Sequence, residues 1–320
     1  MTAKRKQHQK KKTTLHPRSK HHGRYNFDEL LKVVPKLSDV ITPNKFGDLS
    51  INFFDPYAVK LLNTALLKFH YGINFWDIPS SYLCPPIPSR ADYIHNLADL
   101  LTVKNKNNIP KGKHIKCIDI GVGANCIYPI IGIKEYGWFF VGTDIDDISI
   151  TSAKKIVNNN KDLKNNITLR LQPLPKQIFE GVIHPDEKFH ITMCNPPFHA
   201  SLEEASASTS RKIKNLTKSK TTKPILNFGG KHNELWCDGG EAKFIQDMIY
   251  ESRRFKTNCL WFTTLVSKAS NLKGIYSTLK KVNAKEIKTL PMGQGHKISR
   301  IVAWTFLDKT EQNNWKFNKS

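Results

Sequence analysis

The residues with the clearest chemical potential are Asn195, Pro196, Pro197 and Phe198, which follow a strand-like run that ends at Met193. The side-chain oxygen of Asn195 and the main-chain carbonyl of Pro196 are two acceptors that could take both hydrogens of a planar exocyclic amine. This would localise the amine's lone pair toward an incoming methyl group, and Phe198 could stack on the base. The two prolines restrict the backbone and keep both acceptors aimed. The simpler alternative is an ordinary turn after a strand.

A glycine-rich turn upstream could hold the methyl donor. Gly121 and Gly123 lie between a predicted strand and a predicted helix, where glycine lets the main chain approach a ligand closely. A dinucleotide-binding turn would have a third glycine in place of Cys126 and would bind a pyrophosphate, so this shorter turn suits S-adenosylmethionine better. Asp144, at the end of the next strand, could accept bonds from ribose hydroxyls or could cap the following helix. Together with residues 195–198, these residues predict methyl transfer from S-adenosylmethionine to an amine.

The motifs need a sheet that brings their strand ends to one edge. From residue 115 onward, strand-like and helix-like segments alternate, which is typical of a parallel sheet covered on both faces. The predicted strands are 115–120, 138–143, 167–171, 188–193, 258–265, 285–290 and 300–307, and the predicted helices are 126–135, 146–159, 175–182, 241–254 and 272–281. The last two strands are close enough in sequence to form a hairpin, which makes one strand antiparallel. The predicted fold class is α/β, a Rossmann-like class I methyltransferase with a seven-stranded, mostly parallel sheet.

We expect three parts along the chain. Residues 1–24 form a basic, disordered RNA-binding arm, residues 25–105 form an N-terminal helical subdomain, and residues 106–320 form the S-adenosylmethionine-dependent methyltransferase domain. In the helical part, Asp55 is predicted to cap a helix that ends near Gly72. Ser89 is predicted to cap the next helix.

The charge balance points to a polyanionic partner, because 50 Lys and Arg against 27 Asp and Glu give a net charge of +23. Cations are concentrated in two segments without acidic residues, 1–24 and 205–233, which we expect to be disordered in isolation and to order on RNA. The candidate RNA-binding residues are Lys10, Lys11, Lys12, Arg18, Arg24, Arg211, Lys212, Lys268, Gln294 and Arg300.

Other classes of protein are disfavoured by what the sequence lacks. The six cysteines are scattered without a C-x-x-C pair, so neither a metal site nor a disulfide framework is predicted. No apolar run approaches the roughly 18 residues of a membrane span, and the basic N-terminus has no apolar signal region. We therefore expect a cytoplasmic protein without metal or membrane partners, and we expect it to be monomeric.

Several long segments carry a resemblance that covers nearly the whole chain, from about residue 15 to residue 307. They are LHPRSKHHGRY (15–25), GDLSINFFDPYAVKLLNTALL (47–67), CPPIPSRADYIHNLADLL (84–101), IGVGANCIYPIIG (120–132), CNPPFH (194–199), WCDGGEAKFI (236–245) and GQGHKISRIVAWTF (293–306). In these segments the chain resembles the F family of bacterial large-subunit (23S) ribosomal RNA adenine-N6 methyltransferases. It is more distantly similar to a eukaryotic methyltransferase that modifies an adenine in a spliceosomal small nuclear RNA.

The resemblance implies roles for individual residues around the cofactor. Arg90 would reach the carboxylate of S-adenosylmethionine, Gly121 and Asn125 would line its methionine part, and Asp144 would hold its ribose. Gln177 falls where the relatives contact the adenine ring, and Lys268 matches a loop that gates the cofactor in the eukaryotic relative. The implied cofactor site is Arg90, Asp119, Gly121, Gly123, Asn125, Asp144, Gln177 and Asn195. The implied substrate is 23S ribosomal RNA or a large-subunit precursor.

Three alternatives remain open from the sequence. The Asn-Pro-Pro-aromatic motif also serves methylation of cytosine N4 in DNA and of a glutamine amide in release factors, although the positive charge argues against a protein substrate. The RNA could be another structured RNA, similar to a small nuclear RNA. A non-catalytic RNA-binding assembly factor would keep the same fold, but the intact motif at residues 195–198 argues against it.

Overall fold

A computed structural model describes residues 15–80, 82–103, 105, 108–201, 204, 232–294 and 297–317. Five of the predicted RNA-binding residues lie outside these ranges, namely Lys10, Lys11, Lys12, Arg211 and Lys212. Most of the basic segment 205–233 and the side chain of Gln294 also lie outside the described part. The predictions for these residues stay predictions.

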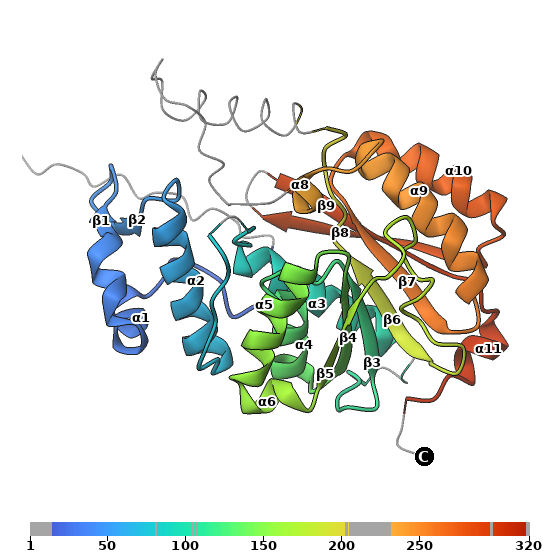
Figure 1. Cartoon of the computed structure of the whole chain (residues 1–320), viewed down its shortest axis with the longest axis horizontal. Helices are drawn as coiled ribbons and strands as arrows, with labels where there is room; N and C mark the ends of the chain where they lie inside the picture. The colour runs from blue at the N-terminus through green and yellow to red at the C-terminus, as the bar shows by residue number, and fades with distance from the viewer. Residues whose placement is uncertain are drawn as a thin grey trace, which may run out of the picture.

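A seven-stranded sheet lies at the centre of the fold (Figure 1), with the strand order β5-β4-β3-β6-β7-β9-β8. Its strands are β3 (Lys116–Ile120), β4 (Phe139–Asp144), β5 (Ile167–Leu171), β6 (Phe189–Cys194), β7 (Cys259–Val266), β8 (Glu286–Gln294) and β9 (Lys297–Thr305). Strands β5, β4, β3, β6 and β7 pair in parallel, and β9 is antiparallel to both β7 and β8. The predicted mostly parallel sheet with one antiparallel strand is confirmed.

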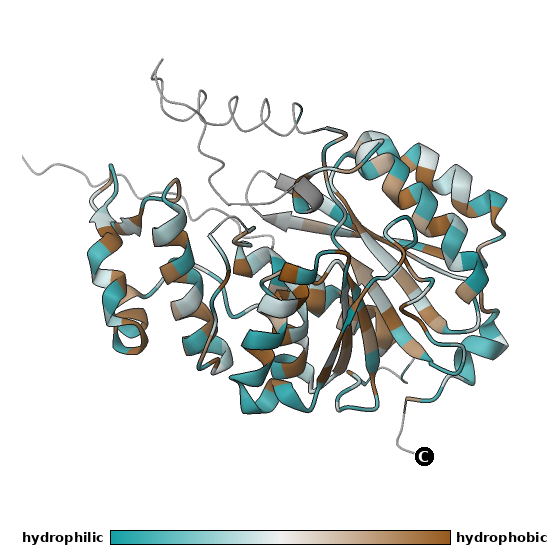
Figure 2. Cartoon of the chain, in the orientation of Figure 1, coloured by the Kyte–Doolittle hydropathy of each residue, from teal (hydrophilic) through white to brown (hydrophobic). Residues whose placement is uncertain are grey.

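Two layers of helices bury the two faces of the sheet. One face packs against α3 (Ile87–Thr102), α4 (Ile127–Tyr136) and α5 (Asp147–Asn158), and the other against α9 (Gly240–Ser252) and α10 (Leu272–Lys281). Figure 2 shows hydrophobic residues along the strands and on the helix surfaces that meet them. Short elements complete this part: α6 (Lys161–Lys164), α8 (His232–Leu235), η2 (Arg253–Phe255), η3 (Ala269–Asn271) and α11 (Lys309–Asn313).

One predicted helix of this domain is absent. Residues 175–182 were predicted as a helix, but this segment consists of turns. Its apolar residues Ile178, Phe179 and Val182 are buried against the α9 face of the sheet, as the pattern required. The backbone there is held by hydrogen bonds to side chains instead of a helical ladder, so apolar spacing alone gave the wrong element.

The N-terminal part consists of α1 (Phe27–Val33), η1 (Pro35–Val40), a hairpin of β1 (Ile41–Pro43) and β2 (Leu49–Ile51), and α2 (Pro56–Tyr71). Asp55 caps α2 by accepting a bond from the Tyr57 N–H at 2.9 Å, and Gly72 ends the helix in the left-handed conformation, both as predicted. The next helix begins at Ile87 with Pro86 before it, not at Ser89, because prolines are tolerated in the first turn.

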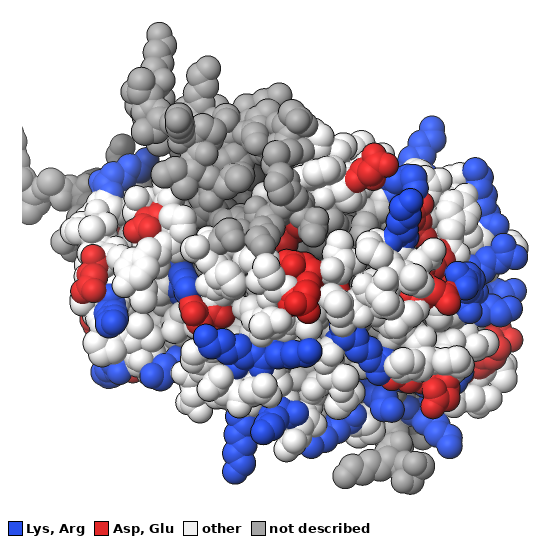
Figure 3. Space-filling model, in the orientation of Figure 1, with Lys and Arg blue, Asp and Glu red and all other residues white. Residues whose placement is uncertain are grey.

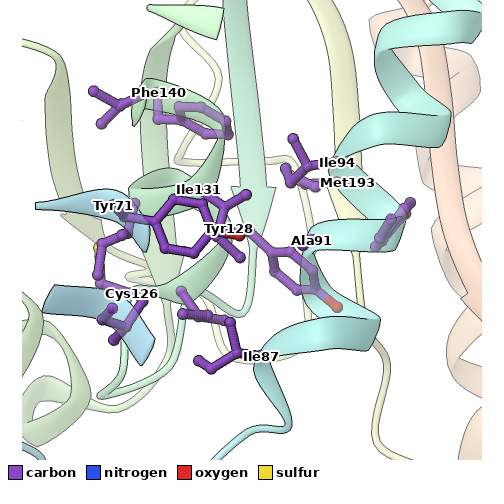
Figure 4. Close-up of a cluster of buried hydrophobic side chains, with 14 of the residues drawn as sticks. Tyr71, Ile87, Ala91, Ile94, Cys126, Tyr128, Ile131, Phe140 and Met193 are labelled. Atoms are coloured by element: carbon purple, nitrogen blue, oxygen red, sulfur yellow. The ribbon is translucent and has the colours of Figure 1, made fainter. Parts of the chain in front are cut away.

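Helix α3 packs as part of the sheet domain although it belongs to the predicted N-terminal subdomain. Figure 4 shows Ile87, Ala91 and Ile94 of α3 beside Tyr128 of α4 and Met193 of β6. One continuous buried cluster includes the apolar residues of α1, α2, α3 and α4 together with one face of the sheet. The division at residue 105 therefore separates sequence segments that share a core.

Residues 15–24, predicted as part of a disordered arm, are held against the folded chain. The Nη2 atom of Arg18 donates to Asp99 at 2.6 Å and to the carbonyl of His95 at 2.9 Å, and its Nε donates to the Tyr136 hydroxyl at 3.0 Å. His21 is buried and bonds to the hydroxyl of Tyr71 at 2.8 Å. This segment contains ordered internal contacts, so the expectation of disorder does not hold for it.

All six cysteines are free thiols, and all but Cys237 are buried. Within the described ranges, no group of three or more His, Cys, Asp or Glu side chains could hold a metal ion. None of the helices described above is long and apolar enough to cross a membrane.

Candidate active site at the strand ends

The register of the sheet brings the predicted motifs together. Ile120 of β3 pairs with Thr143 of β4 on one side and with Cys194 of β6 on the other. The next residue on each of these three strands is a predicted site residue: Gly121, Asp144 and Asn195. Because neighbouring strands are about 4.8 Å apart, these three residues span a row of about 10 Å at the carboxyl edge of the sheet.

The glycine turn after β3 has the geometry of a ligand-binding turn. Gly121 and Gly123 have φ values of +75° and +65°, which other residues rarely adopt. A Cβ atom added at Gly121 would meet no heavy atom within 4 Å, so the main chain faces open space there. The turn is fixed from below, since the amide of Gly121 donates to the Thr143 carbonyl at 2.9 Å and the amide of Gly123 to Asp144 Oδ2 at 2.9 Å.

Asp144 therefore supports the turn, and a different residue caps the next helix. Asp146 is the N-cap of α5, and its own amide donates to Asp144 Oδ1 at 3.0 Å. Burial raises the pKa of Asp144, while the amide bonds from Asp146 and Gly123 oppose that shift. The carboxylate lies at the strand end where a ribose contact was predicted.

Asp119 is the least satisfied acidic group of the site. It is fully buried at 0% exposure, and neither of its carboxyl oxygens has a hydrogen-bond partner among the described residues. Burial raises its pKa to about 8, the negative charge of Asp144 adds to this, and Arg90 opposes it. A buried carboxyl group without partners is costly, so it suits a ligand that brings a donor or a positive charge.

Arg90 reaches the same site from the first turn of α3. Its guanidinium lies 5.6 Å from the centre of the Tyr128 ring, and Tyr128 belongs to the helix that follows the glycine turn. The Tyr128 hydroxyl is buried without a partner within the described ranges. The site thus combines the cation of Arg90 with the buried hydroxyl of Tyr128, and the positive charge of Arg90 acts on the buried carboxyl group of Asp119.

Asn125 fixes the far end of the glycine turn. Its side-chain oxygen accepts the Ile127 amide at 3.1 Å, and its main-chain carbonyl accepts the indole N–H of Trp76 at 2.9 Å. Gln177 is half-buried in the loop after β5 and its amide donates to the Leu174 carbonyl at 2.8 Å. No contact in the structure tests the predicted role of Gln177 near an adenine ring.

Asn195 lies beside this turn with an unused acceptor. Its side chain is half-buried, and its Oδ1 atom is buried without a hydrogen-bond partner in the part of the chain that the structure describes. Pro196 after it is buried, whereas Pro197 and Phe198 are half-buried. An amide oxygen that is buried and unpaired is the feature that a donor such as an amine would satisfy.

Sequence reasoning did not single out Tyr93, which lies one turn after Arg90 on the same face of α3. Its buried hydroxyl lies 2.9 Å from Thr263 Oγ1 and 3.5 Å from the Cys194 amide. Thr263 in turn donates to the Thr192 carbonyl at 2.7 Å. Helix α3 therefore supports both the cofactor side and the residue before Asn195, and the i, i+3 spacing from Arg90 was the available signal.

The predicted RNA-binding residues that are described have different surroundings. Arg18 is occupied by Asp99 and Tyr136, and Arg24 forms an ion pair with Asp48. Lys268 pairs with Glu204 at 3.2 Å. Arg300, opposite Val266 in the sheet, has a buried Nη1 without a partner in the described ranges, which suits an anionic ligand. Figure 3 shows Lys and Arg side chains spread over this face of the molecule.

Comparison with known proteins identifies the family of this chain. A family model described as RNA methyltransferase matches residues 9–308. Ribosomal RNA large subunit methyltransferase F of Cytophaga hutchinsonii is 55% identical over 311 residues, covering 97% of this chain and 97% of the relative. The protein of the same name from Photobacterium profundum is 53% identical over 332 residues, covering 99% of this chain and 98% of that one.

Solved structures of a more distant relative share the fold and part of the sequence. The human METTL16 catalytic domain in complex with the MAT2A 3′UTR hairpin 1 has a TM-score of 0.78 and 28% identity, covering 92% of this chain and 96% of that one. The N-terminal domain of human METTL16 in complex with SAH has a TM-score of 0.72 and 26% identity, covering 92% and 99%. With a family match over most of its length and relatives above 50% identity, this chain belongs to the ribosomal RNA large subunit methyltransferase F family of RNA methyltransferases.

Proposed function

We propose that this protein transfers the methyl group of S-adenosylmethionine to the N6 amine of a specific adenine in 23S ribosomal RNA, either free or in a large-subunit precursor. Relatives at 53–55% identity over nearly the full chain are named ribosomal RNA large subunit methyltransferase F. A 26% identical neighbour was solved in complex with SAH, the demethylated form of this cofactor. We place the protein in the cytoplasm and propose that it acts as a monomer.

The observation that carries the proposal is the unpaired, buried Oδ1 of Asn195 next to the glycine turn. Adenine N6 is a weak nucleophile because its lone pair is shared with the ring. Asn195 Oδ1 and the Pro196 carbonyl would accept hydrogen bonds from the two N–H groups of this amine. These bonds would direct the nitrogen lone pair away from the ring plane. Phe198 would stack on the base, and Pro197 would keep the loop rigid.

The residues around the glycine turn fit the cofactor because they offer hydrogen-bonding groups without partners among the described residues, charges, and backbone that a ligand can approach closely. Asp119 has two free oxygens for a positively charged or donor group, and Arg90 supplies a cation for a carboxylate. Gly121 and Gly123 give close main-chain approach, Asn125 closes the turn, and Asp144 would hold the ribose. Gln177 would contact the adenine ring. When bound, the cofactor supplies an electrophilic methyl group on sulfur, and no metal is required.

The target adenine must leave its stack to reach Asn195, at a cost of a few kcal/mol that is smallest where the base is unpaired. Phosphate contacts by Lys10, Lys11, Lys12, Arg211 and Lys212 would offset this cost, with Lys268, Gln294 and Arg300 closer to the base. Deleting residues 1–14 removes six Lys and Arg but keeps every contact described for residues 15–24. We expect weaker RNA binding with a shallower salt dependence, by up to about 0.7 in slope for each lost phosphate contact. Unchanged affinity at physiological salt would contradict the role of this segment.

The decisive experiment measures transfer of labelled methyl from S-adenosylmethionine to large-subunit RNA from cells that lack the protein. Mass spectrometry of the digested RNA should find N6-methyladenosine at one position, and Asn195→Ala should remove it. RNA that is bound but stays unmethylated by the wild type would favour a non-catalytic assembly factor. Methylation of small structured RNAs in preference to ribosomal RNA would favour the alternative substrate.

A further inference from the structure

A buried carboxylate outside the row of site residues holds a loop beside it. Glu241, in the first turn of α9, is 2% exposed. Its oxygens accept the amide of Ser267 at 2.6 Å, the amide of Lys268 at 3.2 Å and the side-chain amide of Asn271 at 2.6 Å. All three donors belong to the loop that follows β7. Hydrogen bonds to a charged acceptor are among the strong ones, so this loop is anchored to α9.

The residues just before Glu241 hold a second loop, the one that follows Phe198. The His199 amide donates to the Leu235 carbonyl at 3.1 Å, and the Cys237 amide donates back to the His199 carbonyl at 3.1 Å. Gly240 has a φ of +63°, and a Cβ atom there would lie 3.1 Å from the Ala200 amide nitrogen. The segment 235–241 therefore contacts the catalytic loop, residues 195–200, so closely that a side chain at position 240 would crowd Ala200 and would also strain the left-handed backbone.

An ion pair connects the two loops directly. Lys268 Nζ lies 3.2 Å from Glu204 Oε1, and Glu204 Oε2 accepts the Ala200 amide at 2.8 Å. Strands β6 and β7 are parallel neighbours, so the loops that leave them, 195–200 and 267–271, emerge side by side at the carboxyl edge. Both loops and the start of α9 thus form one connected set of contacts next to Asn195.

We propose that Glu241 is a positioning residue for the methyl-transfer reaction, holding the 267–271 loop against the catalytic loop so that Asn195 and Phe198 keep their orientation toward the target base. The inference rests on the proposed function. Glu241 touches neither cofactor nor substrate in this role. Glu241 affects the reaction indirectly, because the segment 235–241 and the 267–271 loop both contact the catalytic loop. A displacement of about 1 Å at a reacting centre can lower a rate by about 100-fold, so loss of this anchor is expected to lower the turnover rate.

The test is Glu241→Gln, which keeps the size of the side chain but places an NH2 group among three N–H donors. We expect the turnover number for RNA methylation to fall about 10- to 100-fold at saturating RNA and cofactor, while the dissociation constant for S-adenosylmethionine changes less than about 3-fold. A milder variant, Asn271→Ala, removes one of the three donors and should give an intermediate fall. If Glu241→Gln fails to fold, Asn271→Ala alone decides the question.

A matched control lies at the other end of the same helix. Ser252 is buried, and its hydroxyl accepts the indole N–H of Trp304 at 3.0 Å. Ser252→Ala should lower the melting temperature without lowering turnover. It therefore serves as the reference for a substitution that affects stability alone. Full turnover in folded Glu241→Gln, or in Asn271→Ala, would overturn the inference. A wild-type protein that methylates no RNA would instead overturn the proposed function.

Discussion

Two aspartates, Asp99 on α3 and Asp119 on β3, show how a candidate ligand site differs from a structural contact. Asp99, on α3, accepts a bond from Arg18 at 2.6 Å and pairs with His16 at 2.8 Å, so both of its oxygens are used. Asp119, at the end of β3, is fully buried and neither of its oxygens has a partner in the described ranges. The first carboxylate is complete within the folded chain, whereas the second lacks the donors that a buried carboxyl group needs.

The pKa values of the two aspartates move in opposite directions because only Asp99 has hydrogen-bond partners among the residues that the structure describes. Partial burial opposes ionisation of Asp99, but the bonds from His16 and Arg18 outweigh it and lower its pKa. Burial raises the pKa of Asp119 to about 8, and the neighbouring Asp144 adds to the effect. Unmet hydrogen bonding at Asp119 and Asn195 is therefore the reason for proposing that the cofactor and the base bind there.

The largest expected effect comes from the unpaired acceptor. Asn195→Ala should lower the single-turnover rate of RNA methylation by about 100- to 1,000-fold, the range seen when one charge-stabilising hydrogen-bond partner is removed from an active site. Binding of S-adenosylmethionine, measured by calorimetry, should weaken by a smaller factor than the rate falls, because Asn195 is one of eight residues in the implied cofactor site. Asn160 is a matched control because its side-chain oxygen is already bonded to the Asn74 amide at 2.8 Å. Asn160→Ala should lower stability and leave the rate intact. Equal rates for Asn195→Ala and the wild type would contradict the proposal that the unpaired Asn195 oxygen takes part in methyl transfer.

Asp119 gives a prediction about pH. Its folded pKa of about 8 lies above the value of about 4 in an unfolded chain, so between these values the folded carboxyl keeps a proton that the unfolded one has lost. The ligand-free protein should therefore lose stability as the pH rises from about 4 to about 8, by about 1 kcal/mol per pH unit from this group alone. Asp119→Asn should lack this slope and should bind S-adenosylmethionine less tightly.

Denaturant unfolding of the ligand-free wild type and of Asp119→Asn at several pH values measures that slope as a difference between the two proteins. Buried histidines, whose depressed pKa values add their own pH dependence, cancel in the difference because both proteins contain them. Parallel curves for the two proteins would show that Asp119 is ionised without a ligand, contrary to its surroundings.

A substitution at Arg18 tests whether Asp99, the aspartate with hydrogen-bond partners, contributes to stability. Arg18→Ala removes bonds to Asp99, Tyr136 and the His95 carbonyl, and should lower the free energy of unfolding by about 1–2 kcal/mol, since the pair is partly exposed to solvent. RNA affinity should change less than it does on deletion of residues 1–14. A large loss of RNA affinity with unchanged stability would indicate that Arg18 contacts RNA.

Arg18 also shows which contacts sequence reasoning misses, and its predicted role in RNA binding stays a prediction. Its position in a basic run predicted a phosphate contact, but its partner Asp99 is 81 residues away, and spacing along the chain does not reveal such a pairing. The segment 175–182 failed for a related reason. Its apolar residues are buried as predicted, but the amides of Ile178, Phe179 and Glu180 donate to the distant carboxylate of Glu251 at 2.7–2.8 Å instead of forming a helix.

The predictions of the strands succeeded because their signals are local. Strand β5 at Ile167–Leu171 and helix α10 at Leu272–Lys281 match their predicted bounds, since periodicity over a few residues determines which face is buried. The row of Gly121, Asp144 and Asn195 follows from three strand ends in a parallel sheet. Tyr93 and Glu241 were missed as supports because each acts on a loop far away in the sequence.

The smallest expected effect concerns Tyr93, whose hydroxyl is hydrogen-bonded and contacts Cys194, the residue before the unpaired Asn195. The Cys194 amide lies 3.5 Å from the Tyr93 oxygen, which bonds to Thr263 Oγ1 at 2.9 Å, and Thr263 donates to the Thr192 carbonyl. Tyr93→Phe keeps the ring and removes this connection, so we expect a loss of about 1 kcal/mol in stability and a fall of about 2- to 5-fold in turnover. Turnover at saturating substrates, measured below the melting transition, checks this. An unchanged turnover with reduced stability would show that the peptide before Asn195 is held by the strand alone, and would place Tyr93 with Asp99 among the purely structural groups.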